Sequence, residues 1–123
     1  MKRAGQIIAV LAAVAIIFIG GRFLIAPEVA AQGYGIAHAP DPYLAVKGVR
    51  DITSGLVVMA LLAMGQRRVL GWALLAFAVT PAADCLIVFA NNGPPAVALG
   101  VHLVTAALLV VGGALLIAAD RRG

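Results

Sequence analysis

Four ionisable residues that could carry out chemistry stand in stretches of sequence that are otherwise apolar. Arg50 and Asp51 precede one long uncharged run, Asp84 stands in the next run, and His102 stands in the last. Two carboxylates around an arginine, with a histidine nearby, suit general acid–base catalysis, because the arginine can hold one carboxylate ionised while the other carries a proton. Such a set could isomerise a substrate or open an epoxide without a cofactor, so these four are the candidate catalytic residues.

Other polar side chains lie within a few helical turns of these residues and could help to bind a ligand. Spacings of three and four residues place side chains on one helix face. The expected ligand-binding residues are Lys47, Ser54, Thr80 and Thr105. No metal or cofactor is expected, because the chain has one cysteine, two separated histidines and no nucleotide-binding or zinc-binding motif.

The composition indicates that a membrane surrounds these polar residues. Of 123 residues, 63% are hydrophobic and 11% are charged, whereas a soluble domain has about 45–50% apolar and about 25% charged residues. An integral membrane protein in contact with lipid is therefore expected. The net charge is +4, but the basic residues stand in pairs and singles between apolar runs. That pattern is typical of topology signals rather than of nucleic-acid binding, so no nucleic-acid partner is expected.

Four segments are long and apolar enough to cross a membrane, which takes about 20 residues. They cover about residues 7–25, 42–64, 69–90 and 95–119. Asp41 and Pro42 predict the start of a helix, and Gly65 predicts the end of one. Short connections make consecutive helices antiparallel. The expected fold is an all-α, antiparallel four-helix bundle in the membrane, formed by a single domain over residues 1–123.

Basic residues predict how this bundle is oriented. The pairs at residues 2–3, 67–68 and 121–122 all fall on one side of a four-span protein, and the positive-inside rule places that side in the cytoplasm. We therefore expect a multi-pass protein of the inner (plasma) membrane with both termini cytoplasmic. A cleaved signal peptide ending near residues 29–31 is the alternative for the first segment, although its apolar run is longer than usual.

The ionisable residues also share one depth in the expected bundle. The uncharged run over residues 52–64 covers only about 20 Å as a helix, so Arg50 and Asp51 are drawn below the outer surface. Together with Arg22, Asp84 and His102 they fall in the outer third of the bilayer. Ionisable groups at such depth are costly unless they pair or reach water. We expect Arg50 to approach Asp51 or Asp84 inside the bundle.

Each of these residues also has a structural explanation. Arg22 and Lys47 could extend their charged ends to the lipid headgroups. Arg50 could form an ion pair that only fixes helix register, and His102 could be a neutral, hydrogen-bonded residue of the interior. Interfacial aromatic residues are expected at Tyr34, Tyr43 and Trp72. Helix contacts are expected at the small-residue pairs Ala9/Ala13 and Ala114/Ala118.

The outer connection, residues 26–41, is longer than antiparallel helices require. It includes His38, for which a solvated position is expected, and it lies on the same side as the ionisable layer. The connection could cover that layer as a lid, or it could form an amphipathic turn on the surface.

Several short motifs resemble a family of small bacterial four-span membrane proteins, the domain of unknown function 4267, in the neighbourhood of the DoxX-like proteins. The resemblance is carried by residues 47–51 with Gly55 and Leu56, by residues 70–72, by residues 81–84 and by His102 with Leu103. It implies the four-helix fold and implies that Arg50, Asp51, Asp84 and His102 belong to the family pattern. It brings no established activity.

Three functions are compatible with this sequence. The first is a polar pocket in the bundle that binds a small lipophilic molecule and acts on it by acid–base chemistry. The second is a non-catalytic assembly or accessory protein whose polar layer holds the helices together. A small transporter component ranks lower, because the inner half of the bundle has no polar lining. Whether the chain is an enzyme and whether it forms a homo-oligomer are left open.

Overall fold

The structure, a computed structural model, describes residues 2–35 and 42–122 of the chain. All regular structure in these residues is helical, which confirms the predicted all-α bundle. The helices are α1 (Lys2–Ile25), α2 (Pro27–Tyr34), α3 (Pro42–Ala63), α4 (Arg67–Phe77), α5 (Val79–Ala90), α6 (Pro95–Val97), the π-helix η1 (Ala98–Leu103) and α7 (Val104–Arg122). His38 and the expected helix cap Asp41 lie outside the described residues.

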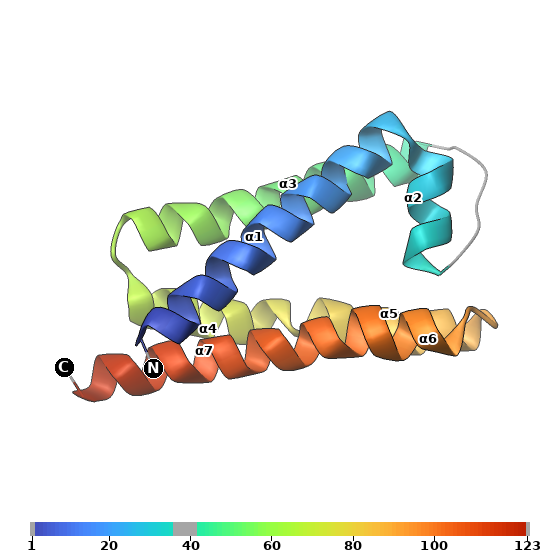
Figure 1. The fold of residues 1–123 in the computed structure, drawn as a ribbon. Helices are drawn as coiled ribbons and strands as arrows, with labels where there is room; N and C mark the ends of the chain where they lie inside the picture. Colours follow the sequence, from blue (N-terminus) through green and yellow to red (C-terminus); the bar gives the residue numbers. More distant parts are fainter. Residues whose placement is uncertain (1, 36–41, 123) are drawn as a thin grey trace.

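The long helices run antiparallel in two layers (Figure 1). In one layer α1 lies against α3, and in the other α4 and α5 lie beside α7. The first half of α1 also packs on α7, so α1 crosses from one layer to the other. The short helix α2, which belongs to the connection between α1 and α3, lies between the two layers at one end. The start of α1 and the end of α7 lie at the opposite end.

Among the described residues, three helical segments are long and apolar enough to cross a membrane. They are residues Lys2–Ile25, Arg67–Ala90 and Pro95–Asp120. Large apolar side chains cover their outer faces, as at Phe18 and Leu86, whose exposed fractions are 65% and 70%. These features support a membrane protein. Helix α3 has a comparable length of 22 residues but contains Lys47, Arg50 and Asp51, and its crossing of the membrane stays a prediction.

Two interruptions shape the second layer. Helix α4 ends one turn before Pro81, because proline has no N–H to donate to the carbonyl of Phe77 and its ring crowds that carbonyl. The chain resumes as α5 with the same general direction. The second interruption is η1, a wider π-helical stretch of six residues. It contains His102, and π-helical turns occur frequently at functional sites.

Glycines allow the helices of each layer to approach closely. A Cβ atom on Gly48 of α3 would lie 2.6 Å from the carbonyl oxygen of Gly20 on α1, and a Cβ on Gly20 would meet the Gly48 carbonyl in return. Gly71 of α4 and Gly113 of α7 have the same reciprocal contact. Backbone carbonyls cannot move aside as side chains do, so each pair needs two glycines.

The two expected alanine pairs differ in burial. Ala9 and Ala13 are fully buried in the core between α1 and its neighbours. Ala114 is exposed and Ala118 is half-buried, because the preceding Gly113 makes the close contact of α7. The turn glycine Gly65, which was expected to close a helix, has a positive φ of 69°.

Candidate functional site

Helix α2 brings a tyrosine into contact with three other helices. Pro27 begins α2 and Gly35, with φ 105°, ends it in the left-handed conformation that favours glycine. The Tyr34 ring lies 6.4 Å from the ring of Phe23 on α1 and 4.5 Å from the ring of His102 on η1. Lys47 of α3 lies over its face. Tyr34 is therefore the centre of the site.

Helix α3 contributes Lys47 and Asp51 to the site. Their side chains are one helical turn apart, and Lys47 Nζ donates a hydrogen bond to Asp51 Oδ2 at 2.7 Å. The same ammonium lies 4.4 Å from the centre of the Phe23 ring and 4.9 Å from that of Tyr34. Aromatic faces attract cations, and the attraction is stronger away from water. Lys47 is thus held by a carboxylate on one side and by two rings on the other.

Helix η1 contributes His102 to the site, and α5 contributes Asp84. His102 is buried and its Nε2 lies 2.7 Å from the backbone carbonyl oxygen of Tyr34. A carbonyl only accepts hydrogen bonds, so Nε2 carries the hydrogen and donates it. The other ring nitrogen, Nδ1, lies 3.9 Å from Asp84 Oδ2. Two lone pairs would face each other there unless a proton sits on Nδ1 or on the carboxyl group.

The Tyr34 hydroxyl connects this pair to α3. Burial raises the pKa of the Tyr34 phenol far above its ordinary value, and a hydrogen bond to the Asp84 side chain raises it further. The negative charges of Asp84 and Asp51 act in the same direction. Tyr34 therefore stays a hydroxyl donor between two carboxylates that belong to opposite layers of the bundle. We call Tyr34, Lys47, Asp51, Asp84 and His102 the polar cluster.

The polar cluster is partly accessible. The side chains of Lys47, Asp51 and Asp84 are 30%, 14% and 18% exposed, whereas that of His102 is 8% exposed. Every buried side-chain nitrogen or oxygen atom among the described residues has a hydrogen-bond partner. Three side chains of the cluster, those of Lys47, Asp51 and Asp84, therefore reach the surface of the bundle.

The expected pairing of Arg50 is wrong. The Arg50 side chain is exposed, and Lys47 makes the ion pair with Asp51 instead. The reason is helix geometry, since residues four apart share a face whereas adjacent residues are turned by about 100° around the axis. The Arg50 carbonyl accepts a hydrogen bond from Ser54 at 3.0 Å, and Arg50 lines a groove of α3 that no residue of the cluster lines.

The three hydroxyl residues expected to bind a ligand lie outside the polar cluster. Ser54 and Thr105 donate hydrogen bonds to backbone carbonyls of their own helices, at 3.0 Å and 2.6 Å. Thr80 and Thr105 are exposed and Ser54 is half-buried. The structure therefore brings together four of the eight expected residues, Lys47, Asp51, Asp84 and His102.

Sequence reasoning placed Tyr34 at the membrane surface, together with Tyr43 and Trp72. The last two are indeed exposed, by 81% and 53%. The signals that could have located Tyr34 are the proline that starts α2 and the glycine that follows Tyr34, which together delimit a short helix inside the outer connection.

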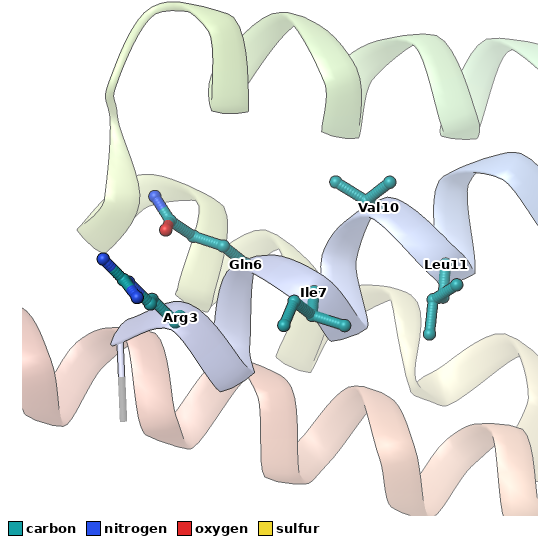
Figure 2. Close-up of a pocket in the computed structure, with 5 residues that line it drawn as sticks. All are labelled: Arg3, Gln6, Ile7, Val10 and Leu11. Carbon is teal, nitrogen blue, oxygen red and sulfur yellow. The ribbon is translucent and has the colours of Figure 1, made fainter.

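Two open grooves lie on the surface of the part of the chain that the structure describes, and the polar cluster lines neither of these two. One groove is lined by Arg3, Gln6, Ile7, Val10 and Leu11 of α1 (Figure 2). The other is lined by Ala45, Val46, Val49 and Arg50 of α3. Among the described residues no three histidine, cysteine or acidic side chains gather as metal ligands would.

Comparison with known proteins gives one match. A family model described as Domain of unknown function (DUF4267) matches residues 13–116. This range begins in α1, ends in α7 and includes the whole polar cluster. Searches of the curated proteins and of the solved structures found no match to the chain.

Proposed function

The chain belongs to the family Domain of unknown function (DUF4267), and we propose that its polar cluster binds a small lipophilic molecule within the membrane and exchanges protons with it. The reactions that suit the cluster are cofactor-free, such as an isomerisation or the opening of an epoxide. We also propose that the protein lies in the inner membrane with both termini in the cytoplasm, as the basic residues indicate.

The observation that supports this proposal is that Tyr34, Asp84 and His102 lie close together. Burial, and after it the Asp84 side chain, raises the pKa of the Tyr34 phenol, and His102 turns toward the same carboxyl the ring nitrogen that its bond to the Tyr34 carbonyl leaves free, at 3.9 Å. Ionisable groups inside a membrane are costly and mark functional sites by default. Apolar side chains of similar volume would often hold helices together equally well.

The partial exposure of the cluster suggests how a ligand meets it. A molecule dissolved in the lipid would keep its apolar body among the exposed side chains and turn a carbonyl, hydroxyl or epoxide oxygen toward the cluster. Asp84 would give or take the proton, and His102 would hold Asp84 in position and accept the proton in turn. Lys47 would stabilise negative charge that develops on the ligand oxygen, while Asp51 holds Lys47 in place.

A structural role is the second candidate, and one observation favours it. The buried polar atoms all have partners within the described residues, as expected if the polar cluster only fastens α2 between the two layers. In that case the protein would be an assembly or accessory protein without an activity of its own.

A turnover experiment separates the two candidates. Purified protein in nanodiscs is incubated with a lipid extract of its own membrane, and the extract is compared by mass spectrometry before and after incubation. The proposal expects at least one lipophilic species to be consumed and an isomer or a hydrated product to be formed. Asp84→Asn should abolish this change, whereas Arg50→Gln, outside the cluster, should not. No change with the wild-type protein would favour the structural role.

A further inference from the structure

The groove on the first three turns of α1 combines an apolar floor with a polar end. Arg3, Ile7 and Leu11 recur every four residues, as do Gln6 and Val10 beside them, so the lining residues form one face of the helix. Ile7 and Leu11 are 58% and 64% exposed. Figure 2 shows Arg3 and Gln6 side by side at one end of this face, with both side chains reaching in the same direction, and Val10 and Leu11 further along.

The polar end of the groove lies where the basic helix ends of the molecule meet. A Cβ atom on Gly5 of α1 would lie 2.7 Å from the Leu116 side chain, and one on Gly71 of α4 would lie 2.7 Å from that of Ile117. The starts of α1 and α4 therefore both pack against the end of α7, as Figure 1 also shows. These two helix starts carry four basic side chains, Lys2, Arg3, Arg67 and Arg68.

Few acidic side chains balance these positive charges at this end. Asp120 near the end of α7 is the one carboxylate there among the described residues, and it is half-buried. Four cations against one anion leave a local excess of positive charge. The groove thus presents a cationic, hydrogen-bonding end and an apolar stretch beside it, which is the pattern of an amphiphile with a negatively charged head.

We propose that this groove binds one anionic phospholipid, with its phosphate at Arg3 and Gln6 and an acyl chain along Ile7, Val10 and Leu11. A guanidinium forms charge-assisted, often paired hydrogen bonds to a phosphate group. From Arg3 to Leu11 the helix rises about 12 Å, close to the roughly 15 Å of hydrocarbon in one leaflet. The proposed site lies at the end of the bundle away from the polar cluster and does not depend on its function.

The test is binding of two lipids with identical acyl chains, phosphatidylglycerol and phosphatidylcholine. Delipidated protein is titrated with each lipid in detergent, and the fraction with one bound lipid is counted by native mass spectrometry. We expect tighter binding of phosphatidylglycerol than of phosphatidylcholine, and Arg3→Gln should weaken the phosphatidylglycerol complex about tenfold. Lys2→Gln removes an equal charge from a neighbouring exposed residue that does not line the groove, so it should weaken binding less than twofold.

Three outcomes would overturn the proposal. Equal effects of Arg3→Gln and Lys2→Gln would mean that only the overall charge of this end attracts the lipid. Equal binding of the two lipids would mean that the groove holds an ordinary annular lipid. Absence of any one-to-one complex with the wild-type protein would mean that there is no site. Thermal unfolding of both variants in the same detergent confirms that each is folded.

Discussion

The close contact between α1 and α3 gives the sharpest prediction, for the variant Gly48→Ala. The new methyl carbon would lie 2.6 Å from the carbonyl oxygen of Gly20 and 3.2 Å from side-chain atoms of Phe23 and Leu24. The side chains can yield by a few tenths of an ångström, but the backbone oxygen cannot. To reach an ordinary contact distance of about 3.4 Å, the two helices must separate by about 0.8 Å.

This separation should destabilise the bundle and disturb the polar cluster. Overpacking of a close-packed interior typically costs about 1–3 kcal/mol, and we expect a loss of unfolding free energy in that range. Lys47 stands one residue before Gly48, and Phe23 belongs to the surface that Gly48 contacts. The Lys47 ammonium, now 4.4 Å from the centre of the Phe23 ring, would move away from it.

The matched control is Gly21→Ala on α1. Nothing lies within 4 Å of a Cβ atom at Gly21, so the free energy of unfolding should stay the same or rise by up to about 1 kcal/mol through helix propensity. The assay is reversible unfolding of purified protein in mixed micelles with increasing sodium dodecyl sulfate, followed by circular dichroism. Wild-type stability of Gly48→Ala, or an equal loss with Gly21→Ala, would refute the close contact.

Three further predictions concern the polar cluster and the topology. Lys47→Met should destabilise the bundle by about 1–3 kcal/mol, since it leaves the half-buried Asp51 charge without its partner. Arg50→Met at an exposed position should change stability by less than about 0.5 kcal/mol, and similar losses for the two variants in the same unfolding assay would contradict the assignment. Folding raises the pKa of the Tyr34 phenol, so the contribution of Tyr34 to the free energy of unfolding is complete below the unfolded pKa of about 10 and is lost as the pH rises above it. Unfolding midpoints measured from pH 8 to 11.5 should therefore fall more steeply for the wild type than for Tyr34→Phe. Parallel curves would speak against a buried phenol. A reporter that is active only in the cytoplasm should work when fused to the C-terminus, and activity of a periplasmic reporter alone at that place would contradict the four-span topology.

The helices could be predicted because their signals are local. Apolar runs of sufficient length and the glycine at position 65 each act on the residues around them. The ion pair between Lys47 and Asp51 has the spacing of four residues that places two side chains on one helix face, whereas the partner expected for Asp51 was the adjacent Arg50. The π-helical stretch η1 has no comparable local signal.

The centre of the polar cluster could not be predicted from such signals. Tyr34 belongs to a helix of eight residues whose position depends on contacts with Phe23, Lys47 and His102. These contacts join four helices, and the contact with His102 spans 68 positions of the sequence. The composition of α2 alone fits a surface turn equally well. Both expectations for the outer connection, a lid over the ionisable layer and an amphipathic turn on the surface, stay predictions, since residues 36–41 lie outside the described part.

Central to this account is that Asp84 serves a bound molecule rather than the stability of the bundle. The most direct measurement compares the wild type, Asp84→Asn and the outer-connection control Glu28→Gln, each extracted from its own membrane. Native mass spectrometry identifies the small molecules that each protein retains, and thermal unfolding measures the stability of the same samples. We expect a retained lipophilic molecule in the wild type and in Glu28→Gln, and its loss in Asp84→Asn with an unfolding temperature close to that of the wild type. A wild-type protein that retains nothing, together with a marked fall in the stability of Asp84→Asn, would contradict it.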